Sequence, residues 1–160
     1  MGKLSGHPVM DRRALWLGAF CAVLPDIDVF GFGFGIPYAD PWGHRGLTHS
    51  LFFAALLSIL LVVLCYRSEP RAVRAGMALY LFLSAASHGV LDALTDGGLG
   101  VAFLSPFDTT RYFFAVRPIV VSPIGIREFF HAQGLHVLGS ELMWIWLPTA
   151  ALFLIIRTLK

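Results

Sequence analysis

Long apolar runs separated by short polar turns organise this sequence. Residues 47–66 carry no formal charge and one histidine, which predicts a membrane-spanning helix of about 20 residues. A turn rich in arginine follows, where Pro70 stops the helix. Residues 75–94 predict a second span, broken near its end by His88 and Asp92.

The remaining chain predicts one more span and two long connections. Residues 141–156 are rich in Trp, Leu and Ile and predict a third span. Residues 14–25 are apolar but too short to cross alone, so they are expected to be partly buried or to belong to a span completed by residues outside this chain. Alternating Phe and Gly in residues 29–46 favour an interfacial loop, and residues 97–138 favour a membrane-hugging lid or re-entrant segment.

Composition supports a membrane protein. Hydrophobic residues make up 57% of the chain and charged residues 14%, against about 25% charged in a typical soluble domain. We therefore expect a single domain over residues 1–160, an all-α, small polytopic membrane helix bundle of three to four helices with the lipid bilayer as its partner. The net charge of +2 gives no reason to expect nucleic acid binding. Cys21 and Cys65 lie in apolar runs and are expected to be buried thiols.

The basic residues are distributed unevenly between the two expected membrane faces. If the turn at residues 67–74 is cytoplasmic, most of the basic residues fall on its side, as the positive-inside rule requires. The chemically interesting residues would then gather at the opposite face. The basic residues on the cytoplasmic side would be Lys3, Arg12, Arg13, Arg67, Arg71, Arg74, Arg157 and Lys160, and those on the other side Arg45, Arg111, Arg117 and Arg127.

Three short motifs carry carboxylates and imidazoles. Asp26 and Asp28 follow Pro25, and alternate residues of an extended segment point the same way. His88 and Asp92 are four residues apart on a predicted helix, so their side chains share one face. The third motif is a pair of histidines, His44 and His49, at the start of the helix predicted for residues 47–66.

These residue types predict a divalent metal site. A carboxylate near hydrocarbon costs about 2.5–3.5 kcal/mol unless it is paired, hydrated or metal-bound. Imidazole with carboxylate suits zinc, with manganese or iron as alternatives. The expected metal ligands are Asp28, His44, His49, His88 and Asp92.

Catalytic roles are expected for neighbouring groups. Whichever of Asp26 and Asp28 is not a ligand is the candidate general base, and His49 is a ligand or a proton carrier. Arg45 could hold an anionic group such as phosphate, or could pair with Asp26 or Asp28. The expected reaction is hydrolysis of an ester or phosphoester by metal-activated water, with a lipid as one candidate substrate.

Two other functions fit the same residues. In an ion- or proton-coupled transporter, His49, His88 and Asp92 would form a relay along the depth of the bilayer. In a non-catalytic membrane protein, the same side chains would only join helices. His7, His131 and His136 are expected to lie outside the site, and Asp96 and Asp108 are expected to be cap or turn residues.

The three motifs resemble those of the bacterial membrane-bound, metal-dependent hydrolases of the LexA-regulated inner membrane protein type. They read PDID at 25–28, HRGLTHS at 44–50 and SHGVLDALT at 87–95. The resemblance implies a multi-pass protein of the bacterial inner membrane, with Asp28 or Asp26, His44, His88 and Asp92 as ligands. The motif order is also distantly similar to zinc-dependent phospholipase C, by analogy only.

The resemblance departs from the family pattern at the N-terminus. Members of that family usually begin with a further apolar helix bearing a Thr-His pair, which this sequence does not show before residue 14. The sequence therefore predicts a site that is short of one histidine if that residue is a ligand.

Overall fold

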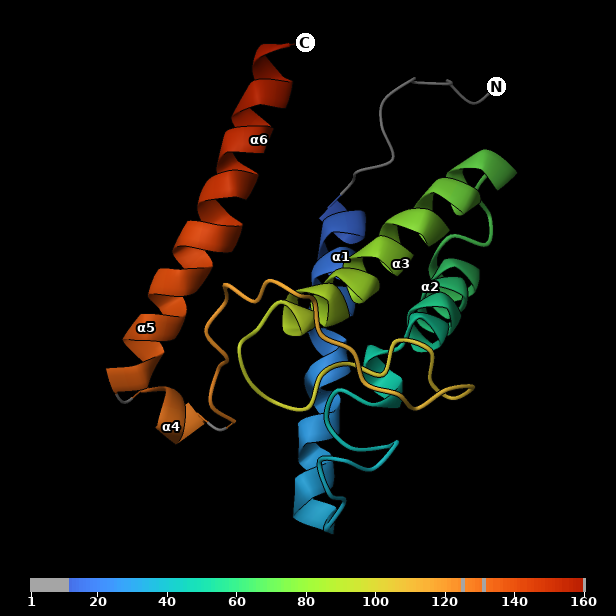
Figure 1. The fold of residues 1–160 in the computed structure, drawn as a ribbon. Coiled ribbons are helices and arrows are strands. Elements are labelled where there is room, and N and C mark those ends of the chain that lie inside the picture. The colour runs from blue at the N-terminus through green and yellow to red at the C-terminus, as the bar shows by residue number, and fades with distance from the viewer. Residues whose placement is uncertain (1–11, 125, 131, 160) are drawn as a thin grey trace, which may run out of the picture.

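The computed structural model describes residues 12–124, 126–130 and 132–159. His7, His131 and the expected N-terminal departure from the family pattern lie outside these ranges. The described chain is helical and forms no β-strand, as the predicted fold class requires (Figure 1). Its helical elements are α1 (Arg12–Val23), the 3-10 helix η1 (Leu24–Phe34), the 3-10 turn η2 (Leu47–His49), α2 (Leu51–Cys65), α3 (Arg71–Ala93), α4 (Ile126–Phe129), α5 (Ala132–Glu141), the π-helical turn η3 (Leu142–Trp146) and α6 (Leu147–Thr158).

Helices α1, α2 and α3 pack around one apolar core. Small side chains such as Ala14, Ala54 and Ala85 let the helix backbones approach closely, which is the usual basis of helix packing in membranes. Both thiols are free; Cys21 is buried as expected, whereas Cys65 is only partly buried.

The first apolar helix is longer than the sequence predicted. Residues Arg12–Phe34 form one helical segment of 23 residues, long and apolar enough to cross a membrane. Pro25 lies in the first turn of η1, where the fixed φ of proline suits the start of a helix. The Phe-Gly run is therefore helical, and the expectation of a loop from residue 29 was wrong; the helix ends instead at Gly35, with φ 77°.

The C-terminal helix is also longer than predicted. The segment Gly134–Thr158 has 25 residues and is the second described helix that is long and apolar enough to cross a membrane. It begins inside the 97–138 segment, which was expected to contain no such helix. Pro148 lies in the first turn of α6, directly after η3, so the chain stays helical across the proline. The span predicted for residues 47–66 corresponds to α2, which has only 15 residues and is too short to cross a membrane alone. The span predicted for residues 75–94 corresponds to α3, which is long enough but not apolar enough to be a candidate span.

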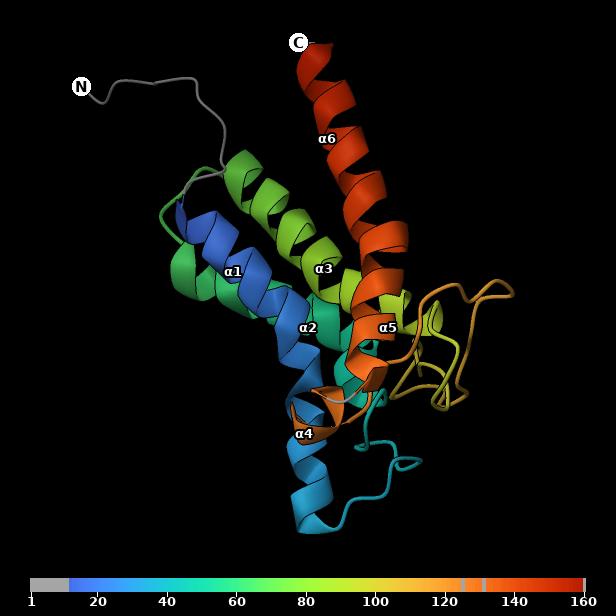
Figure 2. The same cartoon turned by 90° about the vertical axis from the view of Figure 1, so that its left-hand side faces the viewer.

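Figures 1 and 2 show that three arginine-bearing segments lie towards the same end of the molecule. The start of α1, the turn between α2 and α3 and the end of α6 lie towards one end of the molecule. The arginine residues of these segments are therefore at the same end, as the charge pattern predicted. The turn η2, which carries His49, lies towards the other ends of α2 and α3, close to the last turns of α3 that carry His88 and Asp92.

The segment after α3 folds back over these helix ends. Isolated bridges join Thr95 to Ile119 and Val101 to Tyr112. Asp96 accepts a hydrogen bond from the Val121 N–H at 2.8 Å, which links the two ends of this loop. Asp108 accepts one from the Thr110 N–H at 2.8 Å, which is the turn role expected for it.

Gly89 sets how closely α3 can approach the turn η2. A Cβ atom at this position would lie 2.9 Å from the carbonyl oxygen of His49. We predict that Gly89→Ala destabilises the protein by about 1–3 kcal/mol, because backbone must move to accept the methyl group. Gly76→Ala in the same helix meets nothing within 4 Å and is the matched control. Thermal unfolding in detergent measures both; equal midpoints for the two variants would contradict the prediction.

Candidate metal centre

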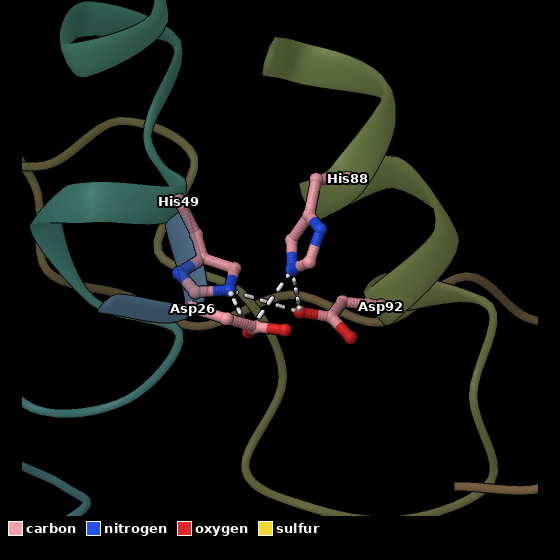
Figure 3. Close-up of side chains that lie close together, drawn as sticks. All are labelled: Asp26, His49, His88 and Asp92. Carbon is pink, nitrogen blue, oxygen red and sulfur yellow. Dashed lines mark hydrogen bonds and ion pairs between the residues drawn. The ribbon is translucent and has the colours of Figure 1, made fainter. Parts of the chain in front are cut away.

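Three segments far apart in the sequence bring the motifs together. Asp26 and Asp28 lie at the start of η1, where it continues α1. His49 ends η2, directly before α2. His88 and Asp92 lie on the last turns of α3. Figure 3 shows the side chains of Asp26, His49, His88 and Asp92 pointing toward a common point.

The distances within this group of four match a metal site. His49 Nε2 lies 3.1 Å from Asp92 Oδ2 and 3.5 Å from Asp26 Oδ1. His88 Nε2 lies 3.1 Å from Asp26 Oδ1 and 3.7 Å from Asp92 Oδ2. Neighbouring ligand atoms of a tetrahedral zinc ion are separated by about 3.4 Å, given metal–ligand distances near 2.1 Å. All four ligand atoms lie within 4.8 Å of one another, so one cation could contact them all.

Two atoms of the group are buried without a hydrogen bond. Neither His49 Nε2 nor Asp92 Oδ2 has a hydrogen-bond partner among the described residues, although they lie 3.1 Å apart. Buried polar atoms are nearly always paired, and leaving one unpaired costs about 1–3 kcal/mol. A cation between the two atoms would satisfy both, so the group fits a divalent metal.

Asp28 forms a second set of contacts behind this group. Its Oδ1 lies 2.8 Å from His44 Nδ1, and its Oδ2 lies 3.1 Å from His49 Nδ1. The Thr48 hydroxyl donates a further hydrogen bond to Oδ2. Its side chain is 1% exposed. A carboxylate at Nδ1 favours the tautomer with Nδ1 protonated, which leaves Nε2 of His49 free to bind a metal.

A backbone carbonyl orients His88 in the same way. His88 Nδ1 lies 2.8 Å from the Ala22 carbonyl oxygen of α1, so Nε2 faces Asp26. This carbonyl is available because Pro25, three residues later, has no N–H with which to form the 3-10 hydrogen bond. The proline that changes the helix geometry therefore also provides an acceptor for His88.

Arg45 forms an ion pair with Asp92. Its Nη2 donates to Asp92 Oδ1 at 2.9 Å, while Nη1 donates to the Thr95 hydroxyl and to the Gly97 carbonyl. The backbone of Arg45 has φ 62°, a left-handed conformation that costs a non-glycine residue energy and is often found at functional sites. From the sequence, Arg45 was expected to bind an anionic group or to pair with Asp26 or Asp28. Its ion pair with Asp92 was not expected.

Arg111 is a structural residue of the site to which the sequence assigned no role. It donates hydrogen bonds to the carbonyl oxygens of Tyr38 and His44, each at 2.9 Å, and of Asp40 at 3.1 Å. These contacts hold the loop that carries His44 and Arg45. The available signal was an arginine in an apolar, aromatic segment, where an unpaired guanidinium is costly.

The electrostatics favour positive charge at the centre. Burial lowers the pKa of His49, but its contacts with Asp26, Asp28 and Asp92 outweigh burial and raise the pKa to about 10. Arg45 neutralises only Asp92, its ion-pair partner. Without a metal, a protonated His49 supplies positive charge to Asp26 and Asp28, and a divalent cation bound at Nε2 would take the place of that proton.

The cluster opens onto a cavity of about 500 Å³. Asp26, His44, His88 and Asp92 lie on its wall, whereas Asp28 and His49 do not. The Asp26 side chain is 48% exposed, and so is the most accessible carboxylate of the three. A small molecule in the cavity could therefore reach the group of four, while Asp28 stays behind it.

Comparison with known proteins identifies the family. The model of the YdjM inner membrane protein family matches residues 1–160. The chain belongs to this family. It is also 41% identical over 146 residues to the inner membrane protein YbcI of Escherichia coli strain K12, an alignment that covers 89% of this chain and 82% of the relative. No solved structure matches.

The family places the chain among inner membrane proteins, as the apolar composition predicted. Neither description names a reaction. The resemblance to hydrolases and to phospholipase C therefore gains nothing from these comparisons, and a chemical function has to be argued from the site.

The hydrogen bonds of Arg111 can be tested apart from the cluster. We predict that Arg111→Lys destabilises the protein by about 1.5–3 kcal/mol, because a lysine cannot reach three carbonyl oxygens with the geometry of a guanidinium. The control is Arg117→Lys, since Arg117 is exposed and lies over the Phe113 ring. Thermal unfolding in detergent distinguishes them; an unchanged midpoint in Arg111→Lys would show that the loop does not need these contacts.

Proposed function

We propose that this protein is a metal-dependent hydrolase of the inner membrane that acts on an ester or phosphoester. The observation that carries the proposal is the group Asp26, His49, His88 and Asp92, whose ligand atoms lie within 4.8 Å of one another. Two imidazoles with two carboxylates suit zinc, with manganese and iron as alternatives. When bound, such an ion lowers the pKa of a coordinated water toward about 7 and so supplies hydroxide at neutral pH.

The proposal reverses the roles first expected for the two carboxylates of η1. Asp26 is exposed to the cavity and belongs to the group of four, so we assign it as a ligand. Asp28 is buried and contacts both His44 and His49 at Nδ1, so we assign it as the residue that orients them. Neither is then free to act as a general base.

His44 is the better candidate for the general base. It lines the cavity, and its Nδ1 lies 3.9 Å from Asp26 Oδ1, next to the group of four. Asp28 fixes its Nδ1 proton, which leaves Nε2 as the acceptor for a proton from water. Arg45, held on Asp92, positions that ligand, and this role replaces the binding of a substrate anion.

The arrangement favours hydrolysis over the two rival functions. A proton or ion relay needs polar groups spaced along the bilayer depth, whereas these ligand atoms form one compact cluster. Residues that only join helices would be expected to satisfy one another, whereas His49 Nε2 and Asp92 Oδ2 have no hydrogen-bond partner among the described residues.

The proposal includes a multi-pass arrangement in the inner membrane. The segments Arg12–Phe34 and Gly134–Thr158 are the candidates to cross the bilayer. Their arginine-bearing ends and the turn between α2 and α3 would face the cytoplasm under the positive-inside rule. The helices α2 and α3 would pack against the first span within the apolar layer.

The metal is the first point to test. We predict that the full chain, purified in detergent and incubated with zinc, retains about one ion per chain, because four ligand atoms suffice for a tetrahedral site. His88→Ala should lower zinc affinity by more than 10-fold, whereas His136→Ala, an exposed histidine of α5, should leave it unchanged. Elemental analysis after dialysis measures both. Full zinc retention by His88→Ala would rule out the assigned ligand set.

Hydrolysis is the second point. We predict that the zinc-loaded protein cleaves at least one member of a panel of chromogenic carboxyl esters, phosphomonoesters and phosphodiesters. Asp92→Asn should reduce kcat/KM by about 100-fold or more, because it removes a ligand and the partner of Arg45. Asp108→Asn, a change at an exposed turn, is the matched control. Equal activity of the two variants would contradict a catalytic role for the cluster.

A further inference from the structure

The cavity beside the cluster has two chemically different walls. One part of its lining is polar and consists of Asp26, His44, Arg45, His88, Asp92 and Thr95. The rest of the lining is mostly apolar. It includes Ile119, Val120 and Ile124 from the loop after α3 and Ile145 and Trp146 from the C-terminal helix, with Ser122 and Glu141 as its polar members. The cavity volume of about 500 Å³ is within the range of cavities that hold whole small molecules.

Both candidate spans contribute to this cavity. Asp26 and Val29 belong to the segment Arg12–Phe34, and Ile145 and Trp146 belong to Gly134–Thr158. Each of these pairs lies in the interior of its segment, away from the ends. The cavity is therefore lined by both helices that are long and apolar enough to cross a membrane, and in a bilayer these positions would lie within the hydrocarbon layer.

We infer that the cavity binds a membrane lipid, with its ester or phosphoester headgroup at the Asp26, His49, His88 and Asp92 group and an acyl chain along Ile145 and Trp146. This inference rests on the proposed hydrolase function and names the substrate class for it. A small polar substrate would leave the apolar wall in contact with water, whereas an alkyl chain covers that wall and leaves the headgroup at the polar one.

The apolar wall gives a test that does not depend on catalysis. The probes are ethyl-, butyl- and hexylphosphonate, which carry a metal-binding headgroup and cannot be hydrolysed. The zinc-loaded full chain is held in an amphipathic polymer without lipid, and binding is measured by calorimetry. We expect affinity to rise by about 4-fold for each added methylene group that enters the cavity.

Variants on the C-terminal helix separate the cavity from general partitioning. Ile145→Ala removes part of the apolar wall and should weaken hexylphosphonate binding by about 5–10-fold while leaving ethylphosphonate unchanged. Ile155→Ala, the same change at an exposed position of the same helix, should alter neither. Equal affinities for the ethyl and hexyl probes, or equal losses in both variants, would overturn the lipid assignment.

A zinc-free arm distinguishes this inference from the proposed function. If ethylphosphonate binds only with zinc but longer chains add nothing, the metal site stands and the lipid assignment fails. If chain-length dependence and its loss in Ile145→Ala persist without zinc, the lipid cavity stands and the metal-dependent function is contradicted. Absence of binding by every probe would overturn the lipid assignment.

Discussion

Three carboxylates in the middle of an apolar chain impose the main constraint on this fold. Asp26, Asp28 and Asp92 converge within a structure whose helices are otherwise covered with Leu, Ile, Val and Phe. A carboxylate in such surroundings is tolerated only with a counterion or hydrogen-bond donors. Arg45 serves Asp92, and imidazoles and Thr48 surround Asp28. The convergence of Asp26 and Asp92 on the buried Nε2 of His49 is the physical basis for proposing a cation at the centre.

The surrounding fold serves to hold these groups in one orientation. Each histidine of the group of four has its Nδ1 engaged, His49 by Asp28 and His88 by the Ala22 carbonyl. Asp92 is held by Arg45, and the loop of Arg45 is held in turn by Arg111. Close approach of α3 to η2 then sets the spacing of the ligand atoms. A site built this way is preorganised, because few of its side chains must rearrange when an ion binds.

The sequence indicated which residues the structure brings together, but not how they are arranged. The helical spacing of His88 and Asp92 was enough to place them on one face, and clustering of Asp and His types indicated a cation. The exchange of roles between Asp26 and Asp28 depends on which carboxylate is buried, which no local pattern reveals. The apolar segments were located, but the helix through Pro25 and the Phe-Gly run was missed, because a 3-10 helix accepts residues that disfavour an α-helix.

The position of the cluster bears on how a substrate would arrive. The centre lies at the start of α2 and the end of α3 and includes Asp26 from the interior of Arg12–Phe34, whereas Gly134–Thr158 contributes only to the cavity lining. A headgroup entering from water would have to pass the loops held by Arg111, whereas one entering from the membrane would pass between Arg12–Phe34 and Gly134–Thr158. The C-terminal helix α6 is exposed throughout its described length, so it leaves hydrocarbon access beside the cavity. Under the proposed function, a lipid headgroup would therefore reach the centre laterally, between the two candidate spans.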